Sequence, residues 1–274
     1  MTSIARAAPP AASTDGGLVL DFARQSVAIA EVEVRKLSRD PTELLTRAVQ
    51  PALWLVVFGQ VFTRVRAIPT GELSYIEFMA PGVLAQSVLF SAIFFGIAAI
   101  WERDLGIIHK LLVSPAYRGA LVMGKALSAG LRGLTQAVIV YLLALVMGVH
   151  LRFSPLALLA VAAIVMLGSA LFATFSLIVA CVVKTRERFM GIGQVLTMPL
   201  FFASNAIYPL SIMPAWLRLV ARANPLTYLV DALRGLMVRG GHAVFGAGPD
   251  VAVQAGVFAV LLAIAARLYP GLVR

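Results

Sequence analysis

The residues most able to take part in chemistry are gathered in one polar segment, residues 101–118, which lies between two long apolar stretches. An unpaired charge in hydrocarbon costs several kcal/mol, so we expect this segment to lie outside any membrane that the flanking stretches cross. The segment reads WERDLGIIHKLLVSPAYR, and its titratable side chains include Glu102, Arg103, Asp104, His109, Lys110 and Arg118.

The same segment carries an apolar stripe. Trp101, Leu105, Ile108 and Leu112 follow one another at steps of four, three and four residues. This is the spacing of one face of a helix. A short amphipathic helix is predicted here, and its apolar face indicates contact with a partner.

No motif for catalysis accompanies this segment. The sequence contains no GxxxxGK[ST] phosphate loop, no HExxH or Cys and His metal spacing, and no GxSxG nucleophile elbow. The three histidines, at positions 109, 150 and 242, are scattered, and we expect them to be solvated in loops. The chain is therefore not expected to be an enzyme, nor to bind a metal or a cofactor itself.

Composition indicates an integral membrane protein. The 274 residues are 60% hydrophobic and only 13% charged, against about 25% charged residues in soluble domains. The formal net charge of +10 suits cytoplasmic loops beside anionic lipids. No nucleic-acid-binding motif accompanies it, so nucleic acid is not expected as a partner.

The N-terminal part is predicted to stay outside the bilayer. Residues 1–17, rich in Ala, Pro, Ser and Gly, are expected to form a disordered cytoplasmic tail. Residues 18–40 have an apolar stripe but no run long enough to span, which favours an interfacial helix. Its headgroup contacts are predicted to be Arg35, Lys36 and Arg39. A soluble helix packed on a partner is the alternative.

The predicted fold is an all-α membrane protein, in which residues 18–274 form a single transmembrane domain. Region 209–238 contains two short helical patterns that are too charged to cross, and we expect an external re-entrant pair. Asn224 before Pro225 is predicted to be the cap between the two helices. Most Lys and Arg then fall on the side of both termini, which places the termini and residues 101–118 in the cytoplasm of a plasma-membrane protein. The six expected spans are about 44–62, 78–100, 119–149, 156–183, 189–208 and 251–268.

Polar side chains inside the spans offer two interpretations. Spans two, four and five have no ionisable residue at mid-depth, so a carboxylate relay for protons or sodium is not predicted and the energy for transport must come from elsewhere. Arg132 could contact an anionic headgroup or reach the membrane edge. Candidate substrate-path residues, each of which could instead hydrogen-bond between helices, are Gln86, Gln136, Gln194 and Asn205.

Two motifs resemble a known family. The string ERDLGIIHKLLVSP resembles the coupling loop of type-2 ABC exporter permeases, and YPLSIMPAWLRLVARANPLTYLVDALRG is similar to the family's signature between spans five and six. The chain is most similar to the group of drug-resistance (daunorubicin) and nodulation-factor exporters. It departs from the family at Ile107, Ile108 and His109, where many relatives have more polar residues.

The resemblance implies a permease subunit that pairs with a second copy, as a homodimer, and with two separate ATP-binding subunits that hold ATP and Mg²⁺. It also implies that region 209–238 closes the outer side. The residues that would couple to the ATPase are Trp101, Glu102, Arg103, Asp104, Leu105, Gly106, Ile108 and Leu112.

The expected function is ATP-driven export of an amphipathic substrate. A hydrophobic drug or a lipid-like molecule is the first expectation, and a lipid-linked glycan or polysaccharide is the second. A membrane scaffold or a passive channel without an ATPase is the alternative from a different class.

Overall fold

A computed structural model describes residues 24, 27–28, 49–65, 68–106, 118–183 and 185–269. Several predictions fall outside these residues: the tail 1–17, most of the helix 18–40 with Arg35, Lys36 and Arg39, and the coupling residues Ile108 and Leu112.

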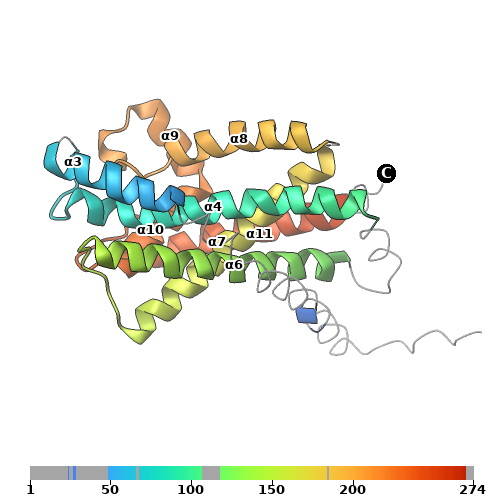
Figure 1. Cartoon of the computed structure of the whole chain (residues 1–274), viewed down its shortest axis with the longest axis horizontal. Coiled ribbons are helices and arrows are strands. Elements are labelled where there is room, and N and C mark those ends of the chain that lie inside the picture. The colour runs from blue at the N-terminus through green and yellow to red at the C-terminus, as the bar shows by residue number, and fades with distance from the viewer. Residues whose placement is uncertain are drawn as a thin grey trace, which may run out of the picture.

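Four long helices form a bundle: α4 (Tyr75–Asp104), α6 (Arg118–Val146), α7 (Pro155–Val182) and α11 (Ala247–Leu268). Helices α4 and α6 run side by side along the long axis of the molecule (Figure 1). Helix α7 packs against α4, α6 and α11, so it lies at the centre of the bundle. The described residues include no strand, only an isolated bridge between Leu151 and Val238.

Within the described part of the chain, these four helices are long and apolar enough to cross a membrane. The prediction of an all-α, multi-pass membrane protein is therefore confirmed. Helix α4 has 30 residues, about 45 Å at 1.5 Å per residue. This length exceeds a hydrocarbon core of about 30 Å, so the charged end of α4 can extend beyond the core.

The remaining two expected spans correspond to shorter helices. The first, 44–62, overlaps the apolar helix Val49–Val65, which includes the π-helical turn η1 (Trp54–Gly59) and α3 (Gln60–Val65). The second, 189–208, overlaps α8 (Arg186–Phe202), a helix of 17 residues. The count of six spans stays a prediction.

Helix α4 begins earlier than the expected start at residue 78. The Ser74 hydroxyl accepts a hydrogen bond from the Glu77 backbone N–H, and the Glu77 carboxylate accepts one from the Ser74 N–H at 2.9 Å. This capping box satisfies backbone donors that a helix end otherwise leaves unpaired. Helix α4 therefore begins at Tyr75, between the first two expected spans.

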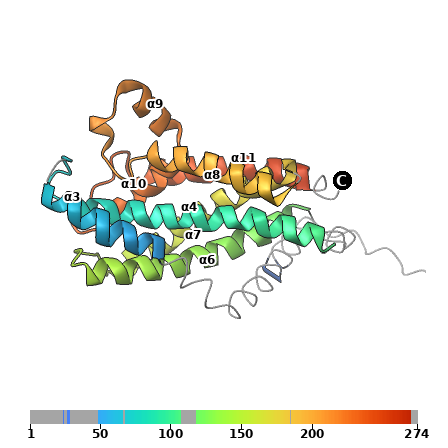
Figure 2. The same ribbon diagram turned by 45° about the horizontal axis from the view of Figure 1, so that its top comes forward.

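Region 209–238 contains the two expected short helices, α9 (Ala215–Ala223) and α10 (Pro225–Met237), after the 3-10 turn η2 (Leu210–Ile212). The predicted cap between them is confirmed, because the Asn224 side chain accepts from the Leu226 N–H at 3.0 Å. Helix α9 stands apart from the bundle, at the end where α3 lies (Figures 1 and 2). Helix α10 packs against α4, α7 and α11. The re-entrant placement of this pair stays a prediction.

Small residues allow the long helices to approach closely. A Cβ at Gly96 of α4 would lie 2.4 Å from the Ser176 hydroxyl of α7, so a larger residue does not fit there. The same hydroxyl accepts from the Gly96 N–H at 3.1 Å and donates to the Ile93 carbonyl at 2.9 Å. Such contacts are typical of helices that pack in membranes.

Candidate functional site

The predicted coupling segment begins on α4 itself. Helix α4 continues through Trp101 to Asp104 and is capped by Leu105, and Gly106 follows in the left-handed region with φ +70°. A glycine in this conformation ends a helix. The prediction of one continuous amphipathic helix from Trp101 onward is therefore wrong, because its first residues are the end of a long helix.

Two apolar residues of the predicted stripe are nevertheless presented to the outside. The side chain of Trp101 is 50% exposed and that of Leu105 is 67% exposed. The end of α4 that carries them lies at the same end of the molecule as the end of α11 (Figure 1). The sequence correctly indicated exposed apolar residues here, although it assigned them to the wrong helix.

Glu102, one of the predicted coupling residues, is buried. Its carboxylate pairs with the Lys125 ammonium of α6 at 2.5 Å, and the two side chains are 11% and 4% exposed. Lys125 also lies over the Phe95 ring, 5.7 Å from its centroid. The pair joins the end of α4 to the first turns of α6, a contact between positions too distant in sequence for a local pattern to reveal.

Arg186, which the sequence did not single out, completes this end of the molecule. Its guanidinium donates to Asp104 at 3.1 and 2.7 Å, and Asp104 also accepts from Arg103. The guanidinium lies over the Trp101 ring, 3.7 Å from the centroid. Because Arg186 begins α8, these contacts attach α8 to α4. We call the residues Trp101, Asp104, Leu105 and Arg186 the docking surface.

The opposite end contains a second group of buried polar residues, here called the α10 cluster: Asn205, Asp231 and Arg234. Asp231 accepts from the Phe245 N–H at 2.8 Å and from the Asn205 amide at 3.4 Å. The Arg234 guanidinium donates to the Asn205 carbonyl at 2.7 Å. It also lies over the Phe78 ring of α4, 3.9 Å from the centroid. The charged side chains of α10 are thus buried and hydrogen-bonded.

The four predicted path residues have different surroundings. Gln86 and Gln136 are buried within the bundle, whereas Gln194 is on the exposed side of α8. Asn205 belongs to the α10 cluster and lines a cavity of about 310 Å³. These different surroundings do not support one substrate path that all four residues line.

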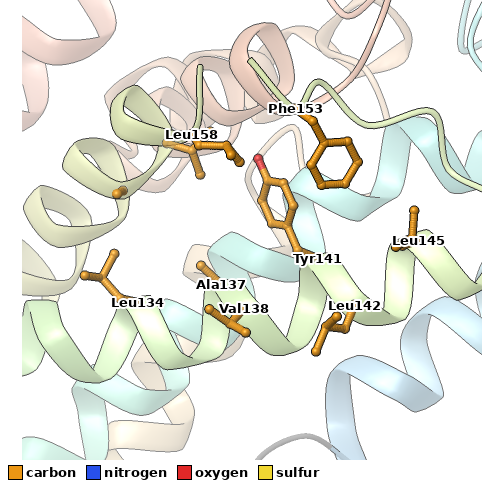
Figure 3. A pocket seen from close by; sticks show the side chains of 10 residues that line it. Leu134, Ala137, Val138, Tyr141, Leu142, Leu145, Phe153 and Leu158 are labelled. Carbon is orange, nitrogen blue, oxygen red and sulfur yellow. The ribbon is translucent and has the colours of Figure 1, made fainter. Parts of the chain in front are cut away.

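A larger apolar pocket, which the sequence analysis did not predict, lies between α6 and α7. Its volume is about 370 Å³, and it is lined by side chains of both helices, among them Leu134, Val138 and Leu142 of α6 and Leu158 of α7. Figure 3 shows the Tyr141 ring directed between Leu158 and Phe153. In sequence, these residues resemble any lipid-facing side chains, so only the packing of the two helices reveals the pocket.

The described residues contain no group of three or more His, Cys, Asp or Glu side chains that could hold a metal ion. The exposed His150 pairs with Glu77, at 2.7 Å between Nδ1 and the carboxylate. This pair holds the α6–α7 loop to the start of α4.

Comparison with known proteins gives a consistent result. The family described as ABC-2 type transporter matches residues 24–238. The ycf38 protein of Cyanophora paradoxa, whose name describes a transport permease, is 30% identical over 73% of this chain and 70% of its own length. The daunorubicin resistance ABC transporter permease protein DrrB1 of Streptomyces coeruleorubidus is 26% identical, over 84% of this chain and 80% of its own. Nodulation protein J of Rhizobium leguminosarum bv. trifolii is also 26% identical, over 84% and 85%.

Proposed function

Because the chain belongs to the ABC-2 type transporter family and is a permease of an ABC transporter, we propose that it exports an amphipathic molecule, using ATP hydrolysed by separate subunits. The observation that carries this proposal is the family match over residues 24–238. The substrate is a hydrophobic drug or a lipid-like molecule taken from the cytoplasm or the inner leaflet.

The docking surface is the proposed contact with the ATP-binding subunits. Trp101 and Leu105 offer exposed apolar area, and the ion pair of Asp104 with Arg186 fixes the Trp101 ring between two helices. A long helix such as α4 can transmit a rigid-body movement from this end to the other. The proposed complex has two ATP-binding subunits, which hold ATP and Mg²⁺, and two permease copies. It lies in the inner membrane with both permease termini in the cytoplasm.

The pocket between α6 and α7 supports an apolar substrate. Nearly all the side chains that line it are apolar, so it offers few partners for sugar hydroxyls, whereas burial of a hydrocarbon group there would be favourable. The name of DrrB1, a daunorubicin resistance permease, agrees with this substrate class.

The test is copurification and transport with the cognate ATP-binding subunit. Leu105→Asp is expected to reduce copurification and to abolish ATP-dependent uptake of a hydrophobic fluorescent drug into inside-out vesicles, because it places a charge at the apolar contact. Leu219→Asp is the matched control, since Leu219 is 72% exposed and its helix, α9, lies toward the opposite end of the molecule from the end of α4 (Figure 1). It should leave copurification unchanged.

Two results would contradict the proposal. Transport at full rate without ATP, driven by a proton gradient, would overturn the energy source. An ATPase complex that tolerates Leu105→Asp as well as it tolerates Leu219→Asp would overturn the assignment of the docking surface.

A further inference from the structure

The buried ionisable side chains fall into two groups with different charge balance. In the part of the chain that the structure describes, they are Glu102, Lys125, Asp231, Arg234 and Asp250. Glu102 and Lys125 balance each other at one end. The other end has two carboxylates and one guanidinium, so the group retains one negative charge when all three are ionised.

Asp231 and Arg234 have partners, and Asp250 has none. Asp231 is held by the Phe245 N–H and the Asn205 amide, and Arg234 by backbone carbonyls. Both carboxylate oxygens of Asp250 are buried without a hydrogen-bond partner. A buried carboxylate in this state is strongly unfavourable unless a positive group neutralises it.

Gln254 shares this property. It is fully buried, and neither its amide oxygen nor its amide nitrogen has a partner. It follows Asp250 by four residues on α11, so both side chains project from one face of that helix. They do not hydrogen-bond to each other, and a third group is therefore needed to satisfy their oxygens.

The first turns of α11 lie beside the α10 cluster. Asp231 accepts from the Phe245 N–H, and Phe245 directly precedes Gly246, the N-cap of α11. Asp250 lies in the first turns of the same helix, and α10 packs against α11. Two carboxylates in one buried region cannot both be ionised without a compensating charge.

We propose that Asp250 and Gln254 form a binding site for one sodium ion, beside Asp231. Carboxylate and amide oxygens are ligands that hard cations prefer. The charge of the proposed ion follows from the net charge of the three side chains. When Asp231, Asp250 and Arg234 are all ionised, their net charge is one negative charge, which one monovalent cation neutralises. This site is independent of the proposed transport function.

The experiment measures thermal unfolding of the purified full-length permease in detergent, with NaCl or with choline chloride at equal ionic strength. Sodium is expected to raise the melting temperature of the wild type in a saturable way, because a ligand that binds only the folded state stabilises it. Asp250→Asn, which removes the charge and keeps the shape, should lose this response. Gln254→Leu should shift it to higher sodium concentrations, about tenfold or more, as is typical when a group supporting a metal is removed.

Asp104→Asn is the matched control. Asp104 is the last residue of α4, whose first turn contacts the α10 cluster through Phe78, and its side chain is 34% exposed. It should keep the full sodium response. Equal melting temperatures in sodium and choline, with a wild type that is stabilised instead by acid, would show that Asp250 carries a proton and would overturn the site. A sodium response that survives Asp250→Asn and Gln254→Leu would place the cation elsewhere and would also overturn it.

Discussion

At one end of the helix bundle Glu102 and Lys125 bury one negative and one positive charge together, whereas the other end buries two carboxylates, Asp231 and Asp250, and only one guanidinium, that of Arg234. The first pair is complete within the chain and fixes the end of α4 against α6. The second group is complete only with a further positive charge. Buried charge therefore has a structural role at the docking end, and it indicates a ligand at the other.

The largest effect is expected from breaking the complete pair. Lys125→Met should lower the free energy of unfolding by about 3–5 kcal/mol, because it removes the cation that pairs with the buried Glu102 carboxylate. Denaturant unfolding of the purified protein measures this loss.

The double substitution Glu102→Met with Lys125→Met provides the control. Well-packed apolar residues often replace a buried ion pair without loss, so the double variant should recover most of the stability. A double variant no more stable than Lys125→Met alone would mean that packing around Lys125 (including its contact with the Phe95 ring), rather than its charge, stabilises this end.

A smaller effect distinguishes the two carboxylates of the other end. Asp231→Leu should cost about 2–3 kcal/mol, because the Phe245 N–H and the Asn205 amide lose their acceptor inside the protein. Asp250→Leu is the matched substitution, and in choline buffer it should cost less than about 1 kcal/mol, because it removes a group without partners. Equal losses would show that Asp250 is held as firmly as Asp231, and the contrast between them would disappear.

The sequence predicted the elements whose signals are local. Asn224 before Pro225 indicated the cap between α9 and α10, and the long apolar runs indicated α4, α6, α7 and α11. These features depend on residues a few positions apart, or on composition over one helix, so they can be read without knowledge of packing.

The parts that could not be predicted depend on contacts between helices. The burial of Glu102 could not be predicted, because its partner, Lys125, lies on the next helix. The apolar stripe from Trp101 crossed Gly106 without any change of period, although the positive φ of that glycine follows the end of α4. Asp250 was placed just before the last span, and its burial arises from the packing of α11 against other helices.

The smallest effect concerns the second ion pair of the docking end. Arg186 and Asp104 are 33% and 34% exposed, so water screens their attraction and the pair should contribute only about 0–1 kcal/mol. Arg186→Met should therefore lower stability by about 1 kcal/mol or less, including the loss of its contact with the Trp101 ring. The loss should shrink further as salt is added, because exposed charges are screened over about 10 Å at 0.1 M salt. The loss in Lys125→Met should persist in the same buffers.

Unfolding at low and high salt measures the loss of stability in both variants. Arg188→Met, on the same helix as Arg186, is the matched control. A salt-independent loss in Arg186→Met as large as that in Lys125→Met would mean that water does not screen either ion pair of this end. Arg186 would then belong to the interior of the bundle rather than to a surface that a partner can reach.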